Sequence, residues 1–336
     1  MKNITSLLIL SLAMAISAKA EFAPEINEVK VLGTENDIIK VLTRDSGFGE
    51  GALYRESTDE VFFSDQPKNM IYRWTEKDGF TTFMRPAGFM GVQGTMDKKI
   101  DFGPNGIALD KDNKLVFCQQ GHRRIARINN EKTFTVDVIA DSYEGKKLNN
   151  TNDLCITKDG SVFFTDPGFW HTRRPIESNE LDYSGIYKIT PEGKVILIDT
   201  LPQPNGIDFS PDEKYMYIAQ SIRSNQCWFV YELDDTKTKV VSRKEFCSLK
   251  KWTGKVRGAP DGMAIGKDGW IYATGNGGVH IFSPDLKHRG LLKIENQVAN
   301  CCVITKGGVE KSLFIVGPKG AYIVDLPTVR KLAEKD

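Results

Sequence analysis

Short runs rich in β-branched and aromatic residues recur along the chain, and turn residues separate them. Several follow an aspartate that opens a tight turn, such as Asp159-Gly160 or Asp268-Gly269. The clearest runs of this kind cover residues 115–118, 162–165, 215–219 and 270–274. A further strand-like run follows each of them, and in most copies another comes after that. The pattern predicts an all-β protein.

A polar residue introduces each repeat. Six segments share an acid or amide followed directly by a strand-like run, and successive members lie 39 to 56 residues apart. The polar residues are Glu50, Asn105, Asn152, Asn205, Asp261 and Asn300. Six units of about fifty residues with four strands each predict a six-bladed β-propeller with four-stranded blades.

The last unit ends after its third strand, near residue 326, so its fourth strand has to come from elsewhere. We expect an N-terminal strand, within 28–32 or within 38–42, to close the ring and cover the exposed sheet edges. The tail over residues 327–336 is predicted to form a short helix.

The first twenty residues have the pattern of a cleavable signal peptide. Lys2 precedes a mainly apolar run over residues 4–17, and Ala18-Lys19-Ala20 matches the small-x-small cleavage pattern. The run is short for a transmembrane helix, and no cysteine follows it for a lipid anchor. The expected organisation is a signal peptide over 1–20, cut near Ala20, and one propeller domain over 21–336. A periplasmic or secreted location without a membrane anchor follows from it.

Charge and cysteine content narrow the possible partners and the possible disulfides. The 45 basic and 44 acidic residues give a net charge of +1, which provides no global field to attract nucleic acid. Export permits disulfides, and Cys227 with Cys247 is the favoured pair among the six cysteines. The sequence leaves the oligomeric state open.

The six repeated polar residues suggest a cation site. The innermost strand of a propeller blade faces the central channel, so these residues would ring one mouth of it. Two carboxylates and several amide oxygens, without His or Cys, favour a hard cation; Ca²⁺ fits best, with Zn²⁺, Mn²⁺ or Fe²⁺ as alternatives. Local capping of turns is the structural alternative for each residue alone, but recurrence in all six units favours a site.

Four motifs carry a family resemblance. The run 143–149 leading into Asn152-Asp153, with Phe-Thr-Asp-Pro at 164–167, Pro-Asn-Gly-Ile at 204–207 and Pro-Asp-Gly-Met at 260–263, resembles the gluconolactonase family. That family includes regucalcin, with squid-type diisopropyl-fluorophosphatase as a more distant relative. Residues 118–127 are similar to its bacterial gluconolactonase branch. The resemblance covers essentially the whole chain after the signal peptide.

The resemblance implies a set of site residues. It implies one divalent cation held by Glu50, Asn152 and Asp261, with Asn205 as a further ligand and Asn105 close to the substrate. Asn300 would lie behind the ligands. Thr151 stands where many relatives carry a proline, which changes the stiffness of that turn but not a ligand.

The implied reaction is metal-dependent hydrolysis of a sugar lactone, such as glucono-1,5-lactone, to the aldonic acid. Asp261 is the candidate catalytic base, and a hydroxide generated at the metal is the alternative. Candidate substrate-binding residues, beside Asn105, lie on the walls of the same face: His122, Arg124, His171 and Arg174. The long connections over 85–103 and 166–184 are candidate lids.

Two other functions stay open from the sequence. One is a non-enzymatic exported propeller that binds a sugar or a protein and uses calcium for structure only. The other is a phosphotriester or fluorophosphate hydrolase, because the same metal could polarise a P=O bond. A conventional zinc hydrolase or a serine esterase is disfavoured, since the chain lacks both His-Glu-x-x-His and Gly-x-Ser-x-Gly motifs.

Overall fold

The computed structural model describes residues 29–90, 103–168, 180–252 and 255–335. The predicted signal peptide, His171 and Arg174 lie outside the described residues. Among the described helices, none is long and apolar enough to cross a membrane.

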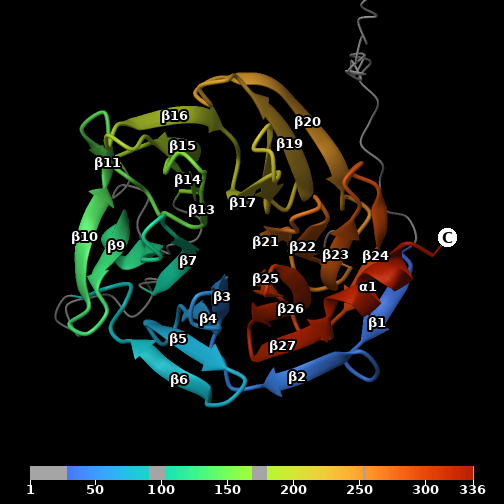
Figure 1. Cartoon of the computed structure of the whole chain (residues 1–336). Helices are drawn as coiled ribbons and strands as arrows, with labels where there is room; N and C mark the ends of the chain where they lie inside the picture. The colour runs from blue at the N-terminus through green and yellow to red at the C-terminus, as the bar shows by residue number, and fades with distance from the viewer. Residues whose placement is uncertain (1–28, 91–102, 169–179, 253–254, 336) are drawn as a thin grey trace, which may run out of the picture.

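Six sheets, antiparallel except for one N-terminal strand, surround a central channel (Figure 1), which confirms the predicted six-bladed propeller. Apart from two strands that the N-terminal segment adds at the outer edges of the last two blades, the strand that comes first in each blade is innermost and the later strands lie progressively further out. The first blade consists of β3 (Gly49–Arg55), β4 (Glu60–Asp65), β5 (Met70–Thr75) and β6 (Gly79–Met84). The second consists of β7 (Pro104–Leu109), β8 (Leu115–Gln119), β9 (Arg124–Asn130) and β10 (Thr135–Ala140). The third consists of β13 (Leu154–Ile156), β14 (Val162–Asp166), β15 (Gly185–Ile189) and β16 (Val195–Thr200).

The remaining blades repeat this order. The fourth blade consists of β17 (Pro204–Phe209), β18 (Tyr215–Gln220), β19 (Cys227–Leu233) and β20 (Val240–Ser248). The fifth contains β21 (Met263–Ile265), β22 (Ile271–Gly275), β23 (Gly278–Phe282) and β24 (His288–Lys293). The sixth contains β25 (Asn300–Lys306), β26 (Val309–Gly317) and β27 (Gly320–Asp325). A 3-10 turn, η1 (Gln120–His122), joins β8 to β9, and a small hairpin of β11 (Ser142–Tyr143) and β12 (Lys146–Lys147) links the second blade to the third.

The N-terminus closes the ring, as predicted, and it adds one strand that the sequence did not predict. Strand β2 (Ile39–Thr43) pairs antiparallel with β27 and is the fourth strand of the last blade. Strand β1 (Val31–Thr34) pairs parallel with β24, so the fifth blade has five strands. Of the two segments considered for closure, the second is therefore the one that completes the blade.

The C-terminal tail forms the predicted short helix, α1 (Leu326–Ala333). Asp325 caps its N-terminus by accepting a hydrogen bond from the Thr328 backbone N–H, at 2.9 Å. Leu326, Val329 and Ala333 are buried on the face that packs onto the propeller.

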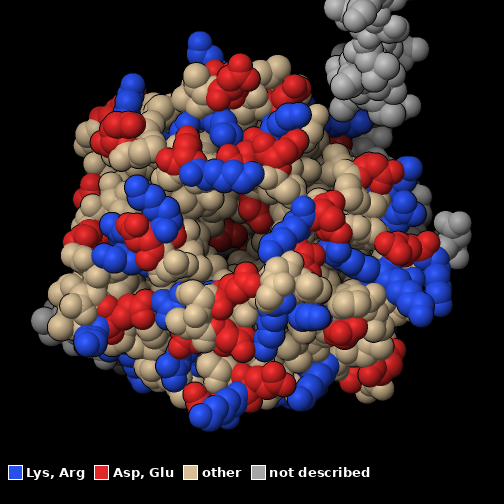
Figure 2. All heavy atoms as spheres, in the orientation of Figure 1, with Lys and Arg blue, Asp and Glu red and all other residues tan. Residues whose placement is uncertain are grey.

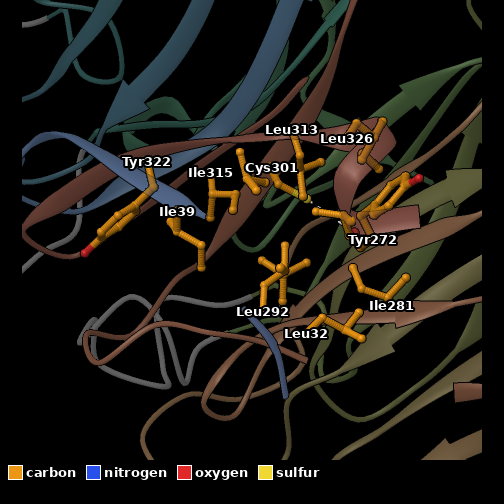
Figure 3. Close-up of a cluster of buried hydrophobic side chains, with 14 of the residues drawn as sticks. Leu32, Ile39, Tyr272, Ile281, Leu292, Cys301, Leu313, Ile315, Tyr322 and Leu326 are labelled. Atoms are coloured by element: carbon orange, nitrogen blue, oxygen red, sulfur yellow. Dashed lines mark hydrogen bonds between the residues drawn. The ribbon is translucent and has the colours of Figure 1, made fainter. Parts of the chain in front are cut away.

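Hydrophobic clusters between neighbouring blades hold the ring together. Figure 3 shows the cluster that joins the fifth and sixth blades to β1, β2 and α1, including Leu32, Ile39, Leu292, Leu313 and Leu326. Because these side chains come from both ends of the chain, their burial fixes the closure as well as the blade packing.

The structure contradicts the predicted Cys227–Cys247 disulfide, because both are free thiols. In the register of β19 and β20, Cys227 lies opposite Ser248, whereas Cys247 lies opposite Trp228. Consecutive residues of a strand point to opposite faces of the sheet. Cys247 therefore shares a face with Trp228 and points away from Cys227.

Candidate functional site

The six repeated polar residues lie at the starts of the innermost strands or just before them, around the central channel (Figure 1). Each innermost strand contacts the innermost strand of the next blade, and β25 contacts β3. All six residues are buried, with at most 7 % of each exposed: Glu50, Asn105, Asn152, Asn205, Asp261 and Asn300. We call them the polar ring.

Glycines allow neighbouring ring residues to approach one another closely. A glycine follows the ring residue in four blades: Gly51, Gly106, Gly206 and Gly262. A Cβ at Gly51 would lie 2.2 Å from the backbone oxygen of Asn105, and one at Gly206 would lie 2.3 Å from that of Asp261. Any side chain there would push the next ring residue outward.

Buried hydroxyl groups fix the ring backbone from the neighbouring blade. Ser64 donates a hydrogen bond to the backbone oxygen of Asn105 at 2.6 Å, and Thr165 donates to that of Asn205 at 2.8 Å. Thr274 donates to the backbone oxygen of Ala299, which precedes Asn300, at 2.8 Å. The second strand of one blade thus positions the ring residue of the next.

The two ring carboxylates repel one another. Burial raises the pKa of Glu50 well above its usual value, and the charges of Asp261 and Asp153 raise it further. The pKa of Asp261 is raised in the same direction, by burial and by the charge of Asp153. The polar side chain of Asn300 lowers the pKa of Glu50, and that of Asn205 lowers the pKa of Asp261. These interactions offset only part of the cost of burying like charges together.

Asp153 belongs to the site, and the sequence analysis did not include it. Its side chain is 7 % exposed, and burial raises its pKa to about 7. It accepts a hydrogen bond from the Leu154 backbone N–H at 2.9 Å, and the Ile207 backbone and the Asn300 side chain also favour its ionised form. A sequence signal did exist, because Asp153 occupies the position that is glycine in four of the other copies.

Asn105 is the ring residue with the least internal support. Its side chain is 1 % exposed, yet neither its amide nitrogen nor its amide oxygen has a hydrogen-bond partner. Burying an unpartnered amide costs free energy unless a ligand or water supplies the missing contact. This amide is therefore available to a bound molecule.

The donor set fits a hard cation that takes oxygen ligands. Carboxylates and amide oxygens converge in the ring, and a cation would compensate the repulsion between Glu50, Asp261 and Asp153. In the described part of the chain, no three His, Cys, Asp or Glu side chains form a group suited to a metal. A cation here would have to take amide oxygens as well as carboxylates.

Two predicted substrate-binding residues lie on the wall between β8 and β9 and already have partners. His122 accepts a hydrogen bond from the Met90 backbone N–H at 3.0 Å, and its ring packs against Phe89. The Arg124 guanidinium donates to Gln119 at 2.6 Å. Their contact with a substrate stays a prediction.

A cavity of about 410 Å³ lies in the channel, and its lining includes Asp153 and Asn300 at the level of the ring. It is also lined by Lys267, in the turn between β21 and β22, and by Glu310, near the start of β26. Figure 2 shows a central hollow with acidic atoms deep inside it. Asp208 lines the cavity as well, but its carboxylate accepts hydrogen bonds from the backbone N–H groups of Phe209 and Ile265. It therefore ties the fourth blade to the fifth.

Comparison with known proteins agrees with this architecture. Residues 48–317 match the model of the family described as "SMP-30/Gluconolactonase/LRE-like region". A gluconolactonase from Zymomonas mobilis is 32% identical over 301 residues, which cover 88% of this chain and 82% of that protein.

Solved structures have the same fold. A gluconolactonase from Xanthomonas campestris superposes with a TM-score of 0.73 at 26% identity, over 86% of this chain and 89% of that one. A calcium-binding protein, regucalcin, from Agrobacterium tumefaciens superposes with a TM-score of 0.64 at 18% identity, over 84% of this chain and 92% of that one. The family match spans most of the chain, from the first blade into the sixth, and this chain belongs to the SMP-30/gluconolactonase/LRE-like family.

Proposed function

We propose that the protein hydrolyses a sugar lactone of the glucono-1,5-lactone type to the aldonic acid, with one divalent cation in the polar ring. The observation that carries this proposal is the burial of Glu50, Asp261 and Asp153 close enough to repel one another, beside amide oxygens. Similarity to gluconolactonases supports the substrate class. Calcium is the cation that we favour, because the donors are all oxygen atoms and the Agrobacterium relative is described as calcium-binding.

Glu50, Asn152, Asn205 and Asp261 would hold the cation. When bound, the cation would polarise the lactone carbonyl and stabilise the negative charge that develops on its oxygen. Asn105, with its unpartnered amide, would contact the substrate beside it.

Asp261 would act as the proton acceptor. It would take a proton from the attacking water while the water oxygen bonds to the carbonyl carbon. The ring C–O bond then breaks, and the same proton passes to the departing ring oxygen, which becomes a hydroxyl group. Burial and the charge of Asp153 raise the pKa of Asp261 only while the ring holds no cation, and a bound cation would lower it again, so the base role proposed for Asp261 rests on its place in the ring.

The location is a separate part of the proposal. The signal-peptide pattern over residues 1–20 favours export, so the lactone would be hydrolysed in the periplasm or outside the cell.

The test is acid release from glucono-1,5-lactone, measured with and without a chelator and then with a series of divalent cations. We expect the chelator to abolish turnover above the spontaneous rate. We expect Asp261→Asn to lower kcat/KM by at least about 100-fold. Asp208→Asn is the matched control. Asp208 is an acid of the same channel, but it lies outside the polar ring and ties two blades together.

The alternatives give different results in the same assay. Hydrolysis of a fluorophosphate but not of the lactone would assign the phosphotriester function. Calcium binding without turnover of either substrate would leave a binding propeller with structural calcium.

A further inference from the structure

Ser221 lies between two members of the polar ring. It follows β18 directly and is buried, with 9 % of its surface exposed. The Asn205 amide nitrogen donates a hydrogen bond to the Ser221 hydroxyl oxygen at 3.0 Å. The same hydroxyl donates to the backbone oxygen of Pro260 at 2.5 Å, one residue before Asp261. One hydroxyl therefore connects the ring segments of the fourth and fifth blades.

The direction of these two hydrogen bonds is fixed by chemistry. A backbone carbonyl oxygen can only accept, so the single proton of the Ser221 hydroxyl is committed to Pro260. The hydroxyl oxygen can then only accept from its other neighbour. The nitrogen of the Asn205 amide fits there, whereas its oxygen would face lone pairs.

The amide oxygen of Asn205 is thereby left for another partner. The amide nitrogen donates to Ser221, and the Asn205 side chain also stabilises the ionised form of the Asp261 carboxylate. Among the described residues, no donor reaches the amide oxygen. The two ends of an asparagine amide are nearly equal in size, so sterics alone would not select this orientation.

We propose that Ser221 is a positioning residue that orients the Asn205 amide so that its oxygen, not its nitrogen, is offered to a divalent cation. The inference rests on the cation site of the proposed function. Ser221 would not touch the cation. It would act only by preventing the Asn205 amide from turning its nitrogen toward the cation.

Ser64 provides a matched control. It is likewise a buried hydroxyl at the inter-blade contact, and it donates to the backbone oxygen of ring residue Asn105 at 2.6 Å. It orients no ring side chain, because the Asn105 amide has no hydrogen-bond partner. Ser64→Ala removes a comparable hydrogen bond without freeing a ligand to rotate.

The experiment measures Ca²⁺ affinity of the metal-free full chain by titration calorimetry, with thermal unfolding recorded for every variant. Ser221→Ala should weaken Ca²⁺ binding about 10-fold to 100-fold. Ser221→Thr, which keeps the hydroxyl, should stay within about threefold of the unchanged chain, as should Ser64→Ala. Ser221→Ala should lose more thermal stability than Ser64→Ala, because it loses two buried hydrogen bonds and Ser64→Ala loses one.

A second background separates orientation from packing. A carboxylate has two equivalent oxygens and no nitrogen end, so in Asn205→Asp the change Ser221→Ala should have little further effect on Ca²⁺ affinity. This comparison also tests the inference if Ser221→Ala alone folds poorly.

The inference is overturned if Ser221→Ala binds Ca²⁺ as tightly as the unchanged chain. It is also overturned if Ser64→Ala loses as much affinity, or if Ser221→Ala is equally harmful in the Asn205→Asp background. An unchanged chain that binds no divalent cation would overturn the cation site itself, and this inference with it. Normal Ca²⁺ binding without lactonase activity would leave the inference standing and refute only the proposed reaction.

Discussion

Two regions of the propeller bury titratable groups, and they differ in how those groups are satisfied. In the fifth blade His280 and His288 are 3.0 Å apart between Nδ1 and Nε2, and His280 Nε2 lies 3.1 Å from the Asn276 backbone oxygen. These bonds form a chain in which both rings are neutral. The polar ring instead holds carboxylates that repel one another and an unpartnered amide, Asn105.

The physical cause of the pKa shifts is the same in both regions, but the consequences differ. Burial lowers the pKa of His280 to about 3 and that of His288 to about 4, so both are uncharged at neutral pH and need nothing more. Burial raises the pKa of the ring acids, but neutral acids are only one way to relieve the repulsion, and a cation is the other. A buried titratable cluster indicates a ligand site when its own neighbours leave its charges or polar atoms unsatisfied.

The largest expected effect is on cation binding by the ring. Glu50→Gln should weaken Ca²⁺ binding by about 100-fold or more, because it removes one of two ring carboxylates. The same change should raise the stability of the cation-free protein, since it also removes the repulsion with Asp261. Calorimetric titration and thermal unfolding measure the two effects. Equal Ca²⁺ affinity in Glu50→Gln and the unchanged chain would remove the ring as the cation site.

Adding the cation should stabilise the folded chain. At a Ca²⁺ concentration one hundred times the Kd, the free energy of unfolding should rise by about 2.7 kcal/mol. Urea unfolding with and without Ca²⁺ measures this difference. The increase should be lost in Glu50→Gln and kept in His280→Phe, because the histidine pair has no part in binding.

Acid should affect the two regions in opposite directions. The folded pKa of His280 lies below its unfolded value of 6.5, so its contribution is complete above pH 6.5 and is lost as pH falls toward 3. At pH 5 the loss amounts to about 2 kcal/mol for this one residue. Asp153 has a folded pKa of about 7 against 3.8 unfolded, so its contribution is present at low pH and is lost as pH rises toward 7.

The cation-free protein with His280→Phe should therefore lose less stability between pH 6.5 and pH 5 than the unchanged chain does. Urea unfolding at a series of pH values tests this. An unchanged slope of stability against pH would show that His280 is not held neutral in the folded state.

The smallest effect is expected at Asp153. Asp153→Asn should weaken Ca²⁺ binding about tenfold or less, because it removes one negative charge near the ring but no residue assigned as a ligand. Competition with a calcium-sensitive dye measures a change of this size. A loss as large as that of Glu50→Gln would make Asp153 a ligand rather than a neighbour of the ligands.

Periodic information was enough to predict the fold and the ring. The spacing of Glu50, Asn105, Asn152, Asn205, Asp261 and Asn300 depends on a repeat along the chain, and the structure places all six around the channel. The repeat could not predict Asp153 as a site residue, because Asp153 stands where four other copies have glycine and so breaks the repeat. Its importance depends on Glu50 and Asn300, which lie in other blades.

By itself, then, the sequence determined the strands, the number of blades, the polar ring and the terminal helix, because each follows from local patterning repeated about every fifty residues. Tertiary structure alone decided that β2 completes the last blade while β1 joins the fifth, that Cys227 and Cys247 point to opposite faces, and that Ser221 holds the Asn205 amide. Each of these depends on which distant segments pack together and on the register in which they do so. The order of residues along the chain does not state either directly.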